Sequence, residues 1–372
     1  MQGKRIVGYD LAKTIAMLFV VLLHSSFYAC GFKPTGLTCF VISFTVVCVP
    51  LFICVNGAIL LNKKLDINRH IRKCIHTLAL LFIWRFIHIV IYRFMFNAPS
   101  IGLSQLITLM FGGNVDGYLM GHFWFINALI SIYIMLPIIK HLWDSNNWTL
   151  LGFICVPIFV FFFVTDGVRA VFDVTDSKFL NSASDSLSFV TALQPFGVYG
   201  YLFIYFITGG FIGKYLLNQN EGLFKHYSIR QVLISSFIVY LVSSLITGAL
   251  HFAQCSKNGF NFAIDFGYWL PSTFFSTVSL FVLLISIGML LKSLKILQIS
   301  VFFGSNTFAV YMLHMFILLS LQTVTGIIQV QNFNVLVSLL LQFVLVIASF
   351  VLLSVCGEIL KKVPLLSNLF KF

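Results

Sequence analysis

Runs of mainly apolar residues recur along the whole chain and restrict its fold more than any other feature. Ten such runs, separated by polar connectors, lie at about 7–30, 38–61, 76–96, 122–141, 149–166, 196–217, 231–252, 268–291, 299–322 and 333–357. A helix needs about 20 apolar residues to cross a bilayer, and helices satisfy their own backbone hydrogen bonds there. We therefore predict an all-α, polytopic transmembrane bundle of about ten spans, forming a single domain over residues 1–372.

The charge content favours lipid over water as the environment of this chain. Charged residues occupy 9% of the 372 positions and hydrophobic residues 59%, whereas soluble domains carry roughly 25% charged residues. A single soluble core stops growing at about 250–300 residues and would not hide this much apolar surface. The net charge is +12, but the basic residues lie in short connectors, so we expect membrane lipids and not nucleic acid as partners.

Basic residues are unequally divided between alternate connectors. If the N-terminus lies inside, the inner segments carry 16 of them: Lys4, Arg5, Lys63, Lys64, Arg69, Arg72, Lys73, Lys140, Lys214, Lys225, Arg230, Lys292, Lys295, Lys361, Lys362 and Lys371. The outer connectors carry five: Lys33, Arg93, Arg169, Lys178 and Lys257. Because cytoplasmic loops are enriched in Lys and Arg, we predict that both termini are cytoplasmic and that the number of spans is even.

The N-terminal run and the cysteines have simple interpretations. Asp10 and Lys13 interrupt the first run and no clear cleavage site follows, so we predict an uncleaved first span and not a signal peptide. The eight cysteines have neither the spacing of metal ligands nor that of a disulfide framework. We interpret them as small buried hydrophobes and expect no metal.

Three ionisable side chains lie in the first run: Asp10, Lys13 and His24. At 100° per residue, Lys13 and His24 differ by only about 20° around the helix, and Asp10 lies on the same face. His24 is about 16 Å further along the helix than Lys13. Ionisable groups inside a membrane are costly, and they mark functional sites by default.

Each of the three also has a structural interpretation. Asp10 and Lys13 can form a pair that reaches the inner interface, and His24 can bond a neighbouring helix as a core histidine. Their position on one stripe favours function.

Five segments of the chain follow, in order, the pattern of one protein family. Residues 9–13 and His24 comprise an Asp, a basic residue three positions later, ten other residues and a His; Lys13 stands where Arg is commoner. The others are residues 49–57, where Asn56 replaces the usual Ser, the Arg-x-x-Arg element 69–73, the His-x-Trp-Phe segment 122–125, and residues 305–314. The chain thus resembles the acyltransferase 3 family over residues 5 to about 320, in the stand-alone form without a soluble esterase-like domain.

This resemblance implies a membrane enzyme of the bacterial inner membrane. Such proteins have ten spans and transfer acyl groups, usually acetyl, to sugars of surface polysaccharides and glycolipids. We therefore expect an O-acyltransferase that uses acetyl-CoA as donor and a lipid-linked or surface glycan as acceptor. Two alternatives stay open: a glycolipid or polysaccharide transporter with the same polar tunnel, and an acyltransferase with another donor or an amine acceptor.

The donor side is predicted from charge. Connector 62–75 is the densest basic patch, and Arg forks suit phosphate geometry. Ordinary positive-inside topology explains the same patch. With the resemblance, we expect Arg69, Arg72 and Lys73 to bind CoA, and Asp10 and Lys13 to guard its entrance.

The acceptor side is predicted from histidines. His is the usual base near neutral pH. His24 lies about 25 Å along its span and His314 about 22 Å along a span of the same direction, so the two can share one depth. We expect His24 to act as general base or acyl carrier, and Tyr311 and His314 to contact the substrate.

Further polar residues have two interpretations each. His122 and Trp124 at an outer edge can stack a sugar, although an interfacial belt also explains Trp124. Arg85 and His88 share one face of the third span, and they either line a cavity or bond backbone groups. We assign no role to His70, His76, His141, His226 and His251.

Overall fold

The computed structural model describes residues 5–28, 34–175, 177–187, 197–216, 227–260, 267–291 and 293–370. Helices make up nearly all of these ranges, which contain no β-strand and a single isolated bridge between Val115 and Tyr118. The all-α prediction is confirmed. Some of the residues used to predict topology and sites lie outside the described ranges: Lys4, Lys33, Lys225, His226, Lys292 and Lys371.

The chain divides into two compact units. Unit 1 comprises residues 1–63 and 152–363, and unit 2 comprises residues 64–151 and 364–372. The helices of unit 1 are α1 (Val7–Tyr28), α2 (Gly36–Thr45), α3 (Cys48–Leu60), most of α7 (Trp148–Phe159), the π-turn η2 (Val160–Val164), α8 (Thr165–Asp173), α9 (Lys178–Leu187), η4 (Gly197–Tyr199), α10 (Tyr201–Leu216), α11 (Ile229–Asn258), α12 (Pro271–Leu290), α13 (Leu294–Ile327), η6 (Val330–Asn332) and α14 (Val335–Leu360). Those of unit 2 are α4 (Ile67–Met95), α5 (Leu103–Met110), η1 (Gly121–Phe123), α6 (Trp124–Asp144), α15 (Pro364–Ser367) and η7 (Asn368–Phe370). The prediction of a single domain stays a prediction.

Nine segments of the described ranges are long and apolar enough to cross a membrane. They coincide with nine of the ten predicted spans. The sixth predicted span contains α10, an apolar helix of 16 residues, which is about 24 Å long and thus shorter than a typical hydrocarbon core. A polytopic helical membrane protein is therefore confirmed, and the inward orientation of the termini stays a prediction.

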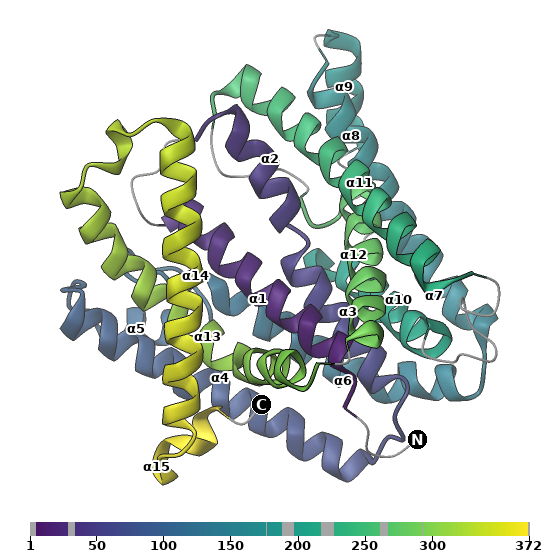
Figure 1. The fold of residues 1–372 in the computed structure, drawn as a ribbon, viewed down its shortest axis with the longest axis horizontal. Coiled ribbons are helices and arrows are strands. Elements are labelled where there is room, and N and C mark those ends of the chain that lie inside the picture. The colour runs from purple at the N-terminus through teal and green to yellow at the C-terminus, as the bar shows by residue number, and fades with distance from the viewer. Residues whose placement is uncertain are drawn as a thin grey trace. The chain divides into compact units, whose positions relative to one another are not determined.

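Helix α1 is the centre of unit 1. It contacts α2, α3, α12, α13 and α14, as Figure 1 shows around the purple helix. Small and flexible side chains on α1, including Ala12, Ala16 and Met17, are fully buried. Helices α3 and α10 also pack closely: a Cβ on Gly57 or Gly209 would collide with the backbone of the other helix. Such small-residue contacts let helix backbones approach where no hydrophobic effect drives association in lipid.

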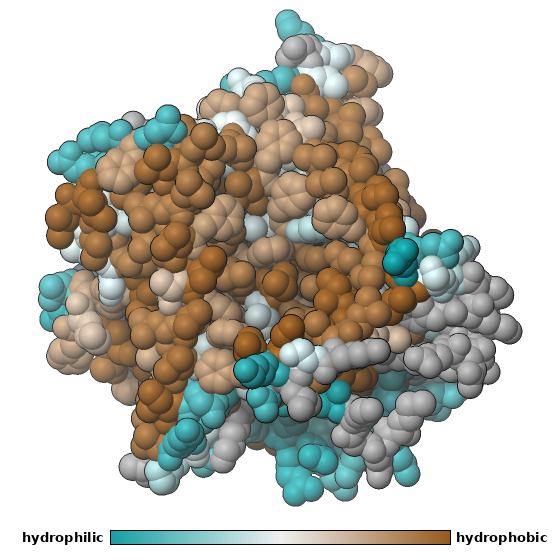
Figure 2. Space-filling view, in the orientation of Figure 1, coloured by the Kyte–Doolittle hydropathy of each residue, from teal (hydrophilic) through white to brown (hydrophobic). Residues whose placement is uncertain are grey.

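Apolar side chains dominate the outward surface of α11 and α14, as the brown areas over these helices in Figure 2 show. Exposed large hydrophobic residues on these two helices include Ile234, Phe237, Ile238, Val242, Leu336, Leu340, Val344 and Ile347. Patches of this extent are rare on soluble proteins, and they fit contact with lipid.

The second predicted span is not one continuous helix. It consists of α2 and α3, which are separated at Val46 and Val47. Pro50 explains the break: it has no N–H for the carbonyl of Val46, and its ring clashes with that carbonyl in a regular helix.

Candidate functional site

Two histidines from distant parts of unit 1 are in direct contact. His24 Nδ1 lies 2.7 Å from His314 Nε2, and the two rings stack with centroids 4.9 Å apart. His314 is fully buried on α13, whereas His24 on α1 is partly accessible. The expectation that the two histidines share one depth is confirmed; their chemical roles stay predictions.

The hydrogen bonds around His314 define where the protons lie. His314 Nδ1 is 2.7 Å from the carbonyl oxygen of Tyr311. A carbonyl oxygen only accepts, so His314 Nδ1 donates, and in a neutral ring His314 Nε2 then carries the lone pair. His24 Nδ1 must therefore donate to His314 Nε2, which leaves the lone pair of neutral His24 on Nε2. Tyr311 thus contributes through its backbone, and its side chain is 7% exposed.

An ion cluster surrounds the start of α1. Asp10 is 2% exposed; its carboxylate accepts from Arg5 at 2.6 and 3.0 Å and pairs with Lys13 at 2.8 Å. The pair predicted between Asp10 and Lys13 is therefore present, and Arg5, which lies before the predicted span, is an additional partner. Because Arg5 and Lys13 each carry a positive charge and Asp10 carries one negative charge, the three residues together have a net positive charge.

Residues of α13, of α14 and of the position directly after α14 extend this cluster. Lys361 donates to the Ser305 carbonyl and to Asn306 Oδ1, both at 2.7 Å, and Asn306 donates to Glu358 at 3.3 Å. Burial lowers the pKa of Lys361, Glu358 opposes this effect, and Arg5 lowers the pKa further. We call Arg5, Asp10, Lys13, Asn306, Glu358 and Lys361 the α1-start cluster. Sequence reasoning missed Glu358, and it used Lys361 only as a topology signal.

Polar side chains also surround the other end of α1. Gln342 of α14 donates to Ser25 Oγ at 2.9 Å and to Ser26 Oγ at 2.8 Å, directly after His24 in the sequence. Gln342 also lines a cavity of about 70 Å³ together with Thr35, Thr38, Val330, Gln331, Phe333, Val335, Ser338 and Leu339. Gln342 thus connects the two serines that follow His24 with this cavity, whose lining surface is mainly apolar.

The predicted donor residues lie at the start of α4 in unit 2. Asp66 caps this helix by accepting from the backbone N–H of Arg69 at 3.0 Å. The Arg69 and Arg72 side chains are exposed. Lys73 instead reaches the hydroxyl of Tyr133 at 3.2 Å and lies 4.8 Å from the centre of its ring. Two of the three residues thus present their charge to solvent, while Lys73 is tied to α6.

His122 and Trp124 adopt different environments in unit 2. His122 is 4% exposed and packs against His88 and Phe123, with ring centroids 5.3 and 4.4 Å away. Trp124 is partly accessible. Of the two side chains, that of Trp124 is therefore the more accessible.

Arg85 and His88 bond backbone groups, which was one of their two interpretations. Arg85 Nη1 donates to the carbonyls of Leu109 and Met110 at 3.0 and 3.1 Å. His88 Nδ1 lies 2.9 Å from the Trp84 carbonyl. Arg85 thereby satisfies free carbonyls at the end of α5.

Comparison with known proteins gives one match. The profile of a protein family described as an acyltransferase domain matches residues 6–358. No curated protein and no solved structure matches the chain. The matched region contains both ends of α1, the His24–His314 pair and the start of α4.

Proposed function

Since the chain belongs to the acyltransferase 3 family and is a multi-pass membrane acyltransferase, we propose that it transfers an acetyl group from acetyl-CoA to a sugar hydroxyl. The proposed acceptor is a lipid-linked or surface glycan, and the proposed location is the bacterial inner membrane with both termini cytoplasmic. The contact between His24 and His314 carries this proposal.

The proton arrangement of the pair suits acyl transfer to a hydroxyl. His24 Nε2 holds a lone pair, because His24 Nδ1 donates to His314 and His314 Nδ1 donates to the Tyr311 carbonyl. As general base, Nε2 removes the hydroxyl proton, the oxygen attacks the thioester carbonyl, and the departing CoA thiolate recovers that proton. A base held in its tautomer by a second group is the general logic of activated nucleophile systems.

The same lone pair permits a two-step route. His24 Nε2 then attacks the thioester carbonyl, the C–S bond breaks and CoA leaves as its thiolate, so that an N-acylimidazolium forms. The sugar hydroxyl next attacks the acyl carbon, the bond from that carbon to Nε2 breaks and restores neutral His24, and the hydroxyl proton passes to the CoA thiolate. Both routes require neutral His24 with a proton on Nδ1, so His314 serves both as a positioning residue. An acylated His24 in protein incubated with acetyl-CoA alone distinguishes the second route from the first.

Charge supports the proposed donor side. Arg69 and Arg72 present exposed guanidinium groups, which match phosphate oxygens in geometry and charge. Asp10 and Lys13 belong to the α1-start cluster, whose net positive charge is compatible with an anionic donor. We assign phosphate binding to Arg69 and Arg72, a supporting role to Lys73, and the CoA entrance to Asp10 and Lys13.

The residues proposed to bind the acceptor are chosen by the accessibility of their side chains. The cavity next to Gln342 offers hydroxyl and amide groups near the residues that follow His24, and Trp124 offers an accessible aromatic face. His314 acts on His24 and not on the sugar in this proposal, and His122 contacts a sugar only after rearrangement.

Mass spectrometry of surface glycans tests the function directly. Cells that lack the gene should lose acetyl groups from the glycan while they export the same amount of glycan, and complementation should restore the acetyl groups. A loss of exported glycan with unchanged acetyl content per chain would instead support the transporter. Retention of acetyl groups in the deletion strain contradicts the proposal.

A further inference from the structure

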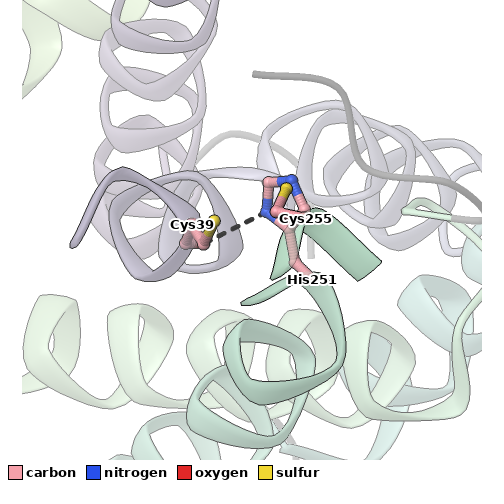
Figure 3. Close-up of side chains that lie close together, drawn as sticks. All are labelled: Cys39, His251 and Cys255. Carbon is pink, nitrogen blue, oxygen red and sulfur yellow. Dashed lines mark hydrogen bonds between the residues drawn. The ribbon is translucent and has the colours of Figure 1, made fainter. Parts of the chain in front are cut away.

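Two cysteines and a histidine converge between α2 and α11 of unit 1. Cys39 lies on α2, and His251 and Cys255 lie on α11, as Figure 3 shows. One ligand atom of each residue lies within 4.8 Å of those of the other two. The three residues are 0%, 0% and 2% exposed. We infer that Cys39, His251 and Cys255 form a binding site for a thiophilic divalent cation, in the first place Zn²⁺.

The spacing on α11 suits one metal ion. His251 and Cys255 are four residues apart, so they lie on the same face of the helix in successive turns. Zn²⁺ binds Cys sulfur at about 2.3 Å and His nitrogen at about 2.0–2.1 Å, so tetrahedral ligand atoms are roughly 3.5–3.8 Å apart. The observed limit of 4.8 Å exceeds this spacing by about 1 Å, which side-chain rotation can supply.

The histidine is already oriented by a backbone group. His251 Nδ1 lies 3.4 Å from the carbonyl oxygen of Cys39, the contact drawn as a dashed line in Figure 3. A carbonyl only accepts, so this contact favours a proton on Nδ1 and the lone pair on Nε2. Metal-bound histidines usually donate their second ring N–H to such an oxygen, which fixes the ring and its tautomer.

Charge balance explains why such a site tolerates burial. An isolated thiolate in an apolar environment is strongly disfavoured. Two thiolates, a neutral imidazole and one Zn²⁺ form a complex with zero net charge, and metal binding itself drives the loss of the thiol protons. Cys39 Sγ lies 3.6 Å from the Thr35 carbonyl oxygen, and the thiol loses that weak hydrogen bond when it becomes a ligand.

The expectation of no metal came from spacing along the chain, where Cys39 and His251 are far apart. Packing of α2 against α11 brings them together. A metal ion there would link the two helices. This role is separate from the proposed acyl transfer, which needs no residue of this site. Three ligands leave the fourth tetrahedral position for water or an anion.

Metal analysis of the full chain tests the site. Protein purified in detergent with a phosphine reductant, and dialysed after exposure to ZnCl₂, should retain about one zinc per chain by mass spectrometry of the metal. Separate Cys39→Ser, His251→Ala and Cys255→Ser variants should lose this zinc. Cys48→Ser is the matched control, because Cys48 is equally buried in the same predicted span and should leave the zinc content unchanged.

A measurement on the wild-type chain covers the case in which the variants fail to fold. Co²⁺ added to the metal-free protein should produce thiolate-to-cobalt charge-transfer bands and the visible bands of tetrahedral cobalt, and Zn²⁺ should abolish them. Zinc should also raise the thermal midpoint of the wild type and of Cys48→Ser. Reduced wild-type protein that retains no zinc and gives no cobalt bands, or peptide mapping that finds a Cys39–Cys255 disulfide in protein from cells, overturns the inference.

Discussion

His314 uses both ring nitrogens, with Nδ1 directed at the Tyr311 carbonyl and Nε2 at His24. The position of the His314 side chain relative to His24 was predictable from the sequence only in part. Span direction and helical rise indicate a common depth with His24, but neither indicates which faces of α1 and α13 meet. The partner of His24 and its tautomer therefore required the structure.

His314→Ala should lower acyl transfer by on the order of 10²-fold or more, because His24 loses the acceptor that keeps its proton on Nδ1. His314→Gln should recover part of the activity, since a side-chain carbonyl can accept from His24 Nδ1. Transfer rates in membranes with matched protein abundance check this order. CoA binding should be unchanged in both variants, and an Ala variant as active as the Gln variant contradicts the positioning role.

Asp10→Asn should destabilise the chain by about 1.5–3 kcal/mol, because a buried carboxylate that bonds Arg5 and Lys13 loses its charge. Thermal unfolding in detergent measures this effect. Asp116→Asn, at an exposed position, should change stability by no more than about 0.5 kcal/mol. Equal effects of the two substitutions would show that Asp10 holds no essential ion pair.

At the scale of elements, a close helix contact positions the start of α1. Gly304 of α13 faces Asp10, and a Cβ there would approach Asp10 Cβ at 2.7 Å and its Cα at 2.9 Å. Such a contact is not visible in a hydropathy pattern, because it depends on which helices pair. The same limit applies to Cys39 and His251, which only the packing of α2 on α11 brings together.

Gly304→Ala should cost about 1–3 kcal/mol by overpacking the contact between α13 and α1. Gly326→Ala lies in the same helix, where a Cβ meets nothing within 4 Å, and it should be neutral or stabilise by about 0.5–1 kcal/mol. Thermal midpoints in detergent distinguish the two. A neutral Gly304→Ala variant would contradict this close contact.

The start of α4 shows that an apolar run does not predict where a helix begins. The third predicted span begins at 76, whereas α4 begins at Ile67, because Asp66 caps a turn rich in polar residues. Arg69 and Arg72 are therefore held on a regular helix and not in a connector.

Arg69→Ala and Arg72→Ala should each weaken CoA binding about tenfold, which corresponds to the loss of one charge-assisted hydrogen bond. Added salt should weaken wild-type binding in the same direction. Arg230→Ala, an exposed arginine at the start of α11, is the control and should bind CoA as the wild type does. If all three variants bind CoA with wild-type affinity, the basic patch at 62–75 does not bind CoA and reflects only the enrichment of Lys and Arg in cytoplasmic loops.

At the scale of the whole molecule, the hydropathy pattern predicted most of the fold, because a span is a local property of about 20 residues. Nine predicted spans coincide with long apolar helices. The remaining span, with α10, decides whether the two termini lie on one side. Because α10 has only 16 residues, the predicted topology rests on the unequal distribution of basic residues.

A reporter that is active only outside the cytoplasm checks this topology. Fused after residue 180 it should be active, and fused after residue 220 it should be silent, because the predicted topology has α10 cross the membrane between these positions. Activity at both positions would mean that α10 does not span, and the opposite pattern would reverse the predicted orientation.

The acetyl content of the glycan in a His24→Ala strain tests the central claim most directly. The variant should insert normally, keep its abundance and bind CoA, yet acetyl groups per repeat unit should fall towards the level of the deletion strain, since loss of a general base costs about 10²–10⁴-fold in rate. The amount of exported glycan should not change. Wild-type acetylation at wild-type abundance in the His24→Ala strain would contradict the proposed mechanism.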